Sequence, residues 1–521
     1  MFNTFAKFAK PAIKASVIGA VLAATPLVEA IPGLSTKAFA QNICADGKPF
    51  KSSRKNITMS KRTYRKYEKV LEIFDQSGEL RKQIDMLKSQ AKEAEALAAT
   101  KTKPEEATEA ATLRSQAQTF LSQVPALENQ TKSMARDAES LIKDALNSSR
   151  TPDYDRASML QLYSQINFER GDTKAAIKNL EDFLSYEAVF RETRLHGITY
   201  SVAQLNYSEE QYDRALDYLN DWFKLSDTVC HKVTTTQNTF IAQLYYVTKD
   251  YNKAISYMQR AIDEAEANPE TDSKEQWYQL LASSYYELGN VNRYRDMLEI
   301  MVVKWSKPEY YKRLASVHQE LGEDTVSYSL FEAIYEMGWM DNKPNEIKMV
   351  AQIQFARESS IKAAWIIESA LRDGRMKSDT DNTRLLAQAY MSSYEFEKAV
   401  PPLTKVADEL QDPELYLQVA GMEYGNGNSA NAVRMFDKAL ALYKKKKKPS
   451  RSKIDSATLG KGAALLDQKK VMDACRVFQK LGRESKNRRI KRQVSSFKKA
   501  IEADIAREDM FSGNDTKRKC K

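Results

Sequence analysis

A spacing of twelve residues recurs nine times in this 521-residue chain, and in eight of the nine cases both positions carry a small side chain. The nine pairs of positions are Ser164 and Ala176, Ala203 and Ala215, Ala242 and Ala254, Ala282 and Tyr294, Ala315 and Ser327, Ala351 and Ala363, Ala387 and Ala399, Ala420 and Ala432, and Gly462 and Ala474. Small side chains let two paired helices approach closely, and the units recur close to the 34-residue period of tetratricopeptide repeats (TPRs). The sequence therefore predicts an all-α TPR superhelical solenoid, with about nine helix pairs over residues 151–482.

The apolar positions and turn residues inside the units agree with helix pairs. Ala432, Phe436 and Ala439 recur at spacings of four and three, which places them on one helix face. Glycine marks the turn between the helices in several units, because it adopts the left-handed conformation that ends a helix. The units are expected to begin near residues 157, 196, 235, 275, 308, 344, 380, 413 and 455. A single unit cannot bury its apolar face alone, so stacking must supply the core, and arrays of this kind usually bind other proteins.

The first forty residues have the order of a secretory signal peptide. Lysines precede an apolar stretch from Val17 to Val28, and the small-x-small triplet Ala38–Ala40 stands before Gln41. The apolar stretch is too short to span a bilayer as one helix. We expect cleavage after Ala40 and a periplasmic location. Cleavage after Ala30 and an uncleaved membrane anchor are the alternatives.

Residues 41–150 form a helical region of different character. Apolar residues from Tyr64 to Phe74 fall on one helix face, as in the first helix of another pair. From about 79 to 145 the chain is rich in Ala, Glu, Gln and Lys, and Pro104 interrupts it near the middle. This pattern predicts an inserted antiparallel helical hairpin or short coiled coil. A solvated helical extension without a partner is the alternative.

The positive charge is concentrated at the C-terminal end. The formal charge is +10, of which residues 1–40 contribute +3 and residues 483–521 contribute +7, so the repeat body is close to neutral. A neutral body argues against nucleic acid as a partner. Residues 483–521 are predicted to form a basic helix and tail. This tail and the run Lys444–Lys448 could contact anionic lipid headgroups, but such runs are more often solvated linkers.

Catalytic and metal-binding patterns are missing from the sequence. Its three histidines fall in different repeats, and although His231 adjoins Cys230, no CxxC or HxxxH spacing supports a zinc site. Neither a phosphate-binding loop nor a GxSxG nucleophile motif is found. We therefore expect no enzyme activity, no catalytic residue, no metal and no cofactor.

Four cysteines in an exported chain permit two disulfides and three pairings. Cys44 and Cys230 both lie outside the predicted helices, so this pair is the first choice. Cys475 follows the close-contact residue Ala474 and is expected to be a small buried apolar side chain. Cys520 is one residue from the end of the sequence and could be left unpaired.

The first helix of each pair is expected to line a concave groove. Its fifth, ninth and twelfth positions should point into this groove, where amides and aromatic rings suit an extended peptide. Three cations recur at the fifth position of successive repeats and predict a basic ladder for a carboxylate or an acidic segment. The alternative is that polar residues merely solvate the groove. The predicted partner-binding residues are Tyr200, Gln204, Tyr207, Gln243, Tyr246, Gln279, Tyr286, Lys312, Lys348, Gln352, Arg384, Gln388 and Tyr424.

Several stretches together resemble one family. They are Ile43–Lys48, Gln211–Leu216 continuing to Trp222-Phe223, Glu275–Leu281 and Pro308–Val317. Most of 41–482 is similar to the periplasmic TPR proteins encoded beside TonB–ExbB–ExbD systems in marine-type Gram-negative bacteria, whereas the 79–145 hairpin and the basic tail depart from that family. The resemblance implies an accessory of TonB-dependent import of iron chelates or haem, with TonB-complex subunits as partners. A periplasmic adaptor for outer-membrane assembly or cell-wall enzymes is the alternative.

Overall fold

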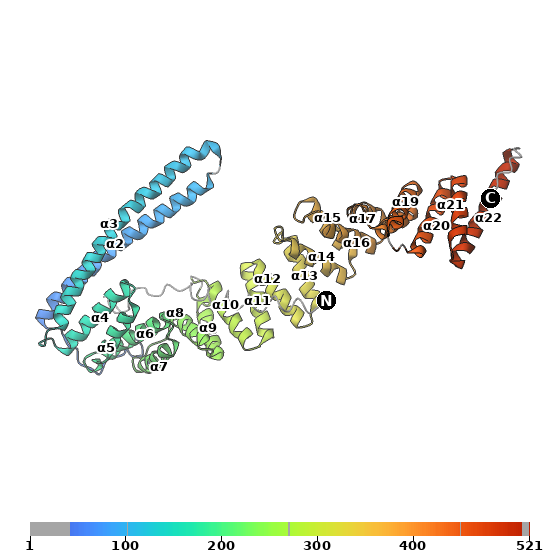
Figure 1. Ribbon diagram of the computed structural model, residues 1–521. Coiled ribbons are helices and arrows are strands. Elements are labelled where there is room, and N and C mark those ends of the chain that lie inside the picture. The colour runs from blue at the N-terminus through green and yellow to red at the C-terminus, as the bar shows by residue number, and fades with distance from the viewer. Residues whose placement is uncertain are drawn as a thin grey trace. The chain divides into compact units, whose positions relative to one another are not determined.

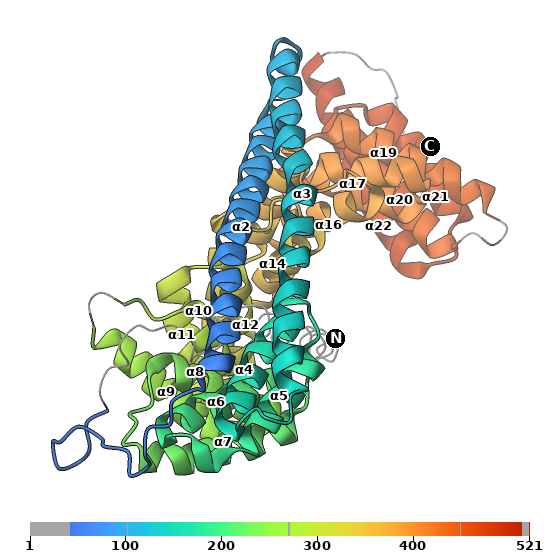
Figure 2. The same cartoon turned by 90° about the vertical axis from the view of Figure 1, so that its left-hand side faces the viewer.

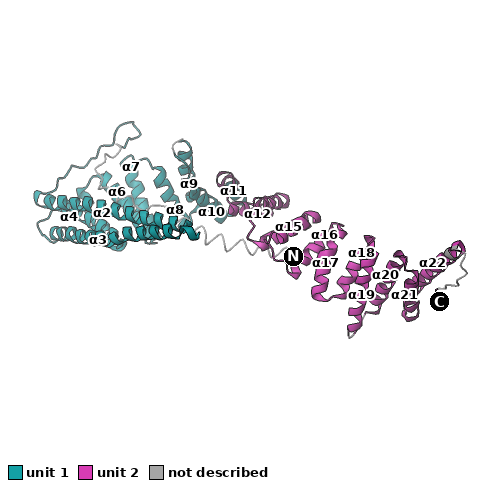
Figure 3. Cartoon of the chain, turned by 90° about the horizontal axis from the view of Figure 1, so that it is seen from above, with its two compact units in different colours: residues 1–297 teal, residues 298–521 magenta. Residues whose placement is uncertain are grey.

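A computed structural model describes residues 42–101, 103–268, 271–446, 448, 450–512 and 520 of the chain. The predicted signal peptide, residues 1–40, lies outside these residues. Within the described residues all regular elements are helices, and the one β contact is an isolated bridge between Ile43 and Pro49 (Figure 1). No described helix is both long enough and apolar enough to cross a membrane. The chain divides into two compact units, residues 1–297 and 298–521 (Figure 3).

The described residues contain the nine predicted helix pairs, which confirms the all-α TPR fold. The pairs that begin in unit 1 are α4 (Asp153–Glu169) with α5 (Thr173–Leu184), α6 (Glu192–Ser208) with α7 (Tyr212–Thr228), α8 (Thr235–Val247) with α9 (Tyr251–Glu266), and α10 (Glu275–Glu287) with α11 (Val291–Trp305). Those of unit 2 are α12 (Pro308–Glu320) with α13 (Asp324–Glu336), α14 (Pro344–Ala356) with α15 (Ser360–Arg372), α16 (Thr380–Ser392) with α17 (Phe396–Leu410), α18 (Pro413–Gly425) with α19 (Ser429–Lys445), and α20 (Arg451–Asp467) with α21 (Val471–Glu484). A further helix, α22 (Arg488–Ser512), follows, and the 3₁₀ helices are η2 (Pro104–Glu106) and η3 (Glu187–Val189).

Both positions of the twelve-residue spacing are buried in every helix pair. In the pair α20 and α21 the first of these positions is a glycine. A Cβ atom added at Gly462 would lie 2.5 Å from Cε1 of Phe478, whose side chain is fully buried. These contacts explain why the spacing identifies the fold, because larger side chains would push the paired helices apart.

A left-handed residue closes the first helix of every pair. These residues are Gly171, Glu210, Lys249, Gly289, Gly322, Glu358, Tyr394, Gly427 and Lys469. In the pair α18 and α19 the amide of Gly427 donates to the carbonyl of Tyr424, and the amide of Asn428 donates to that of Glu423. This is the Schellman arrangement, which satisfies carbonyls at a helix end.

The inserted hairpin is longer than the sequence predicts. It consists of α2 (Lys61–Thr100) and α3 (Ala107–Leu146), each 40 residues and about 60 Å long. The two helices lie side by side in both views (Figures 1 and 2). The predicted border near residue 79 is wrong, because no proline interrupts the chain there and α2 continues from the repeat-like stretch into the hairpin arm. At the base, Val70 and Ile142 pack with Leu162 of α4, whereas alanines such as Ala94 and Ala117 pack at the far end.

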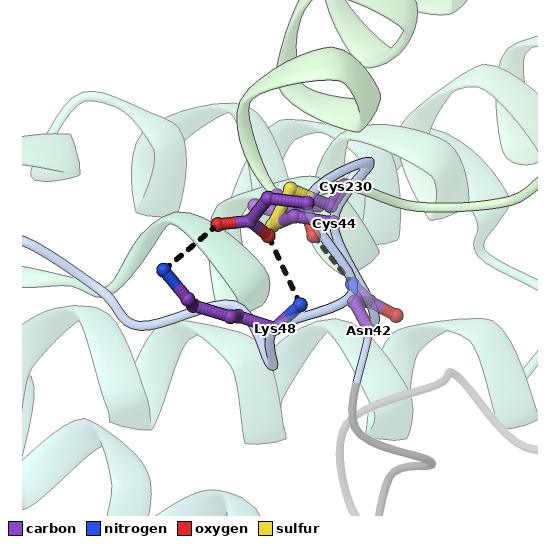
Figure 4. Close-up of a disulfide and its surroundings, with 6 residues drawn as sticks. Asn42, Cys44, Lys48 and Cys230 are labelled. Atoms are coloured by element: carbon purple, nitrogen blue, oxygen red, sulfur yellow. Dashed lines mark hydrogen bonds and ion pairs between the residues drawn. A yellow bond between two sulfur atoms is a disulfide. The ribbon is translucent and has the colours of Figure 1, made fainter.

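The extended segment 42–60, here called the strap, ties the start of the described chain to unit 1. A disulfide joins Cys44 to Cys230, the pair that the sequence favours (Figure 4). Beside it the Asn42 amide donates to the Val229 carbonyl at 2.9 Å. The strap thereby reaches the loop that follows the second helix pair.

Two buried carboxylates hold the rest of the strap. Glu192, at the start of α6, accepts hydrogen bonds from the Ser52 and Ser53 hydroxyls. Burial alone would raise the pKa of Glu192, but these hydroxyls, its own backbone amide and Arg54 hold it below its usual value. Asp155 of α4 accepts from the backbone amide of Ser60 at 3.2 Å. The strap thus runs from the second helix pair back to the start of α2.

The second disulfide differs from the prediction. Cys475 of α21 is bonded to Cys520, so Cys475 is not a free apolar residue and Cys520 is not unpaired. Both are buried. The reason lies in α22, which packs its Val494 and Ile501 into the cluster that contains Cys475 and so keeps the chain end near α21.

Candidate partner-binding surface

The predicted groove positions of unit 1 include three buried side chains. Tyr200, Tyr207 and Gln243 are 7%, 3% and 6% exposed. The Tyr200 and Tyr207 rings each lie 5.5 Å from the ring of Phe240 on α8, so they fill the space between adjacent repeats. Burial raises both tyrosine pKa values, that of Tyr207 to about 12. The prediction that these three residues face a partner is therefore wrong.

The other predicted residues of unit 1 are half-buried: Gln204, Tyr246, Gln279 and Tyr286. The Tyr246 ring lies 5.6 Å from that of Tyr251 at the start of the second helix, and the Tyr286 ring lies 5.3 Å from that of Tyr294. Burial, with a contribution from nearby Glu287, raises the pKa of Tyr246 to about 12. These rings stabilise their own repeats and leave only part of their surface for a partner.

Four first helices of unit 2, α12, α14, α16 and α18, expose the residue at their ninth position. These residues, here called the first-helix row, are Ser316 of α12, Gln352 of α14, Gln388 of α16 and Gly421 of α18. The corresponding residues Gln243 and Ser283 of unit 1 are buried. The amides and small side chains of the row leave room for a backbone to approach and supply hydrogen-bond donors and acceptors.

The predicted basic ladder divides into one paired and two unpaired cations. Lys312 donates to both carboxylate oxygens of Glu346 at 2.7 Å, so its charge is balanced by the next first helix. Lys348 and Arg384 are half-buried, and neither forms an ion pair with any described residue. The buried Nε of Arg384 also has no hydrogen-bond partner among the described residues. Two cations on adjacent repeats are therefore available to a carboxylate.

Tyr424 lies at the end of the predicted set, and its side chain is 41% exposed. Phe355 and Met391, at the same position of the preceding repeats, are half-buried and Phe355 packs on the core of unit 2. Unit 2 thus combines an exposed polar row, two unpaired cations and one accessible ring. This combination suits an extended peptide segment that carries negative charge.

Of the residues that anchor the strap, only Cys44 and Cys230 were predicted from the sequence. The buried Asp155 and Glu192 were not among the predicted residues. Cys230 and His231 do not form a zinc site in this structure. The Cys230 sulfur is in a disulfide, and His231 Nε2 lies 2.8 Å from the Gln237 side-chain oxygen.

The chain matches no protein-family model and no curated protein sequence. Solved structures with similarity to parts of it include three described as TPR proteins. The C-terminal part of a TPR repeat-containing protein from Cytophaga hutchinsonii is 14% identical over 48% of this chain and 97% of that one, with a TM-score of 0.27. A TPR protein from Parabacteroides merdae is 14% identical over 50% and 98%, with a TM-score of 0.23. The TPR2AB domain of yeast Sti1, solved with an Hsp90 peptide, is 17% identical over 53% and 97%, with a TM-score of 0.26. At these TM-scores the fold assignment rests on the helix pairs of this chain.

Proposed function

We propose that this protein is a non-catalytic periplasmic scaffold that holds an extended segment of a partner protein on unit 2. The observation that carries the proposal is the exposed first-helix row together with two unpaired cations on the same helices, Lys348 and Arg384. A half-buried cation without a counter-ion is costly, and a partner carboxylate would offset that cost. The two disulfides support an oxidising compartment, as the predicted signal peptide does.

The partner we propose is a subunit of the TonB complex, and the function is that of an accessory in the uptake of iron chelates or haem. This step rests on the resemblance of residues 41–482 to periplasmic TPR proteins of TonB systems. The linker of TonB proteins is rich in proline and charge. Such a segment is extended without internal hydrogen bonds, so its backbone is free to pair with the Gln352 and Gln388 amides.

In-cell photocrosslinking tests the partner. A photoreactive residue is placed at Gln352 or Gln388, and a control is placed at Glu397, an exposed position on the second helix α17. We expect a TonB-complex subunit to be captured from both row positions and not from Glu397. Capture of outer-membrane assembly or cell-wall proteins would replace the TonB assignment with the adaptor alternative.

Charge reversal tests the surface itself. We expect Lys348→Glu with Arg384→Glu to lower capture from Gln352 at least tenfold, because both cations then repel an acidic segment. The matched control is Arg372→Glu with Lys398→Glu, which makes the same charge change on the second helices α15 and α17. Equal capture by the two double variants would show that Lys348 and Arg384 do not bind the partner.

A further inference from the structure

Two stretches near the C-terminal end contain many cations and no acids. Residues 438–454 include eight Lys or Arg residues, and residues 485–501 include seven, without one Asp or Glu in either stretch. The stretches are separated in sequence by most of α20 and α21. Such a charge excess is strongly repulsive unless it has a counter-charge.

The structure brings the two stretches together at one end of unit 2. Arg451, at the start of α20, lies 3.4 Å from Glu484 at the end of α21. The buried Asp455 accepts a hydrogen bond from the buried Ser485 hydroxyl in the next connection. The connection before α20, which contains the lysine run, and the connection before α22 therefore lie at the same end of unit 2. We call the exposed cations there the cationic end: Lys444, Lys445, Lys446, Lys448, Lys486, Arg488, Arg489, Lys491 and Arg492.

The cationic end is fixed in place and is not a loose tail. Helix α22 buries Ile490, Val494 and Ile501 in the cluster it shares with α21, which turns the cations of its first turns outward. None of the nine side chains forms an ion pair with a described residue. The first acid of α22 is Glu502, fourteen residues and about 21 Å beyond Arg488. The positive potential therefore stays concentrated at this end.

We propose that the cationic end binds the anionic phosphate surface of a phospholipid bilayer. A bilayer presents many phosphates over a broad area, which suits cations spread over two connections and the start of a helix. A nucleic acid fits less well, because the nearby rings of Tyr443 and Phe497 are buried or half-buried and give bases no stacking surface. An acidic protein fits less well, because the described residues among these cations include no exposed large aromatic or apolar side chain that could act as an anchor. This inference is independent of the first-helix row.

Vesicle co-sedimentation of the protein from Gln41 onward, with both disulfides formed, tests the proposal. We expect binding to vesicles containing phosphatidylglycerol, little binding to pure phosphatidylcholine, and a loss of binding as salt is raised. The test variant is Arg488→Glu, Arg489→Glu and Arg492→Glu. Acids are favourable at a helix N-terminus, so this variant should keep α22 folded, which circular dichroism checks. Its affinity for the anionic vesicles should fall at least tenfold.

A matched control exists at the start of α2. Lys61, Arg62 and Arg65 are exposed and have the same spacing at a helix N-terminus as the three α22 cations. Their replacement by Glu changes the net charge equally and should leave vesicle binding unchanged. Equal binding by the two triple variants, or equal binding of the wild type to neutral vesicles, would overturn the proposal. Wild-type protein that binds neither kind of vesicle but binds polyglutamate or duplex DNA would also overturn the proposal.

Discussion

At the scale of single residues, the distance between paired helices depends on positions that carry only a very small side chain or, in glycine, none. Gly462 faces the fully buried ring of Phe478, which is itself stacked on Phe497 with the ring centroids 4.9 Å apart. The spacing rule therefore extends to its limit here, because even alanine is too large.

Gly462→Ala should lower the free energy of unfolding by about 1–3 kcal/mol through overpacking. The matched control is Gly421→Ala, also within a helix, where a Cβ atom would meet no atom within 4 Å. That change should stabilise the protein by about 0.5–1 kcal/mol, because glycine loses more backbone entropy than alanine. The midpoint of urea unfolding checks both. A shift of the two variants in the same direction would contradict the proposed contact.

At the scale of elements, the spacing located the helices better than their ends or their accessible faces. Six of the nine first helices begin at the predicted residue, whereas α4, α6 and α20 begin four residues earlier. Each of these three helices has 17 residues. Their extra turn lies before the first residue of the twelve-residue spacing, so the spacing could not predict it.

The accessible face could be predicted only in part. The position in the helical turn predicts the direction in which a side chain points, but not whether a neighbouring repeat covers it. The same rule selected Gln243 and Gln352, and only Gln352 is exposed. In unit 1 the bulky Phe240 and Tyr200 fill the space between first helices, whereas in unit 2 the ninth-position residues Gln352 and Gln388 are exposed. Packing between repeats decides the difference, and a single-repeat pattern does not contain it.

The hairpin is an element with two separable parts. Its base shares a core with α4, whereas Ile84, Leu87 and Val124 pack only among residues of α2 and α3. Replacing residues 84–127 by a four-residue glycine-containing turn should therefore leave the free energy of unfolding of the repeats within about 0.5 kcal/mol of the wild type.

The control for the hairpin deletion is Ile142→Ala at the base. Ile142 is fully buried against α4, so its loss should cost about 2–5 kcal/mol. Urea unfolding followed by circular dichroism compares the two. A deletion as damaging as Ile142→Ala would mean that the far end of the hairpin supports the repeats.

At the scale of the whole molecule, each compact unit contains one disulfide. Cys44–Cys230 lies within residues 1–297 and Cys475–Cys520 within residues 298–521. The bonds span 186 and 45 residues. In the chain-entropy model such loops stabilise a fold by about 5 and about 4 kcal/mol.

Removing either disulfide should therefore weaken only its own unit. We expect Cys44→Ser with Cys230→Ser to increase hydrogen exchange in α6–α8 and to expose the strap to proteases, with α20 and α21 unchanged. Cys475→Ser with Cys520→Ser should show the reverse pattern. Hydrogen–deuterium exchange read by mass spectrometry distinguishes the units. Equal loss of protection in both units after either change would contradict their independence.

The pairing of the cysteines also has a consequence for how the protein matures. The four cysteines are bonded in the order in which they occur, the first with the second and the third with the fourth. In the export that we propose for this chain, N-terminus first, Cys230 emerges while Cys475 and Cys520 are still behind the membrane. An oxidase that joins cysteines as they arrive would form the native bonds directly. Maturation of this protein should accordingly need a thiol oxidase but no disulfide isomerase.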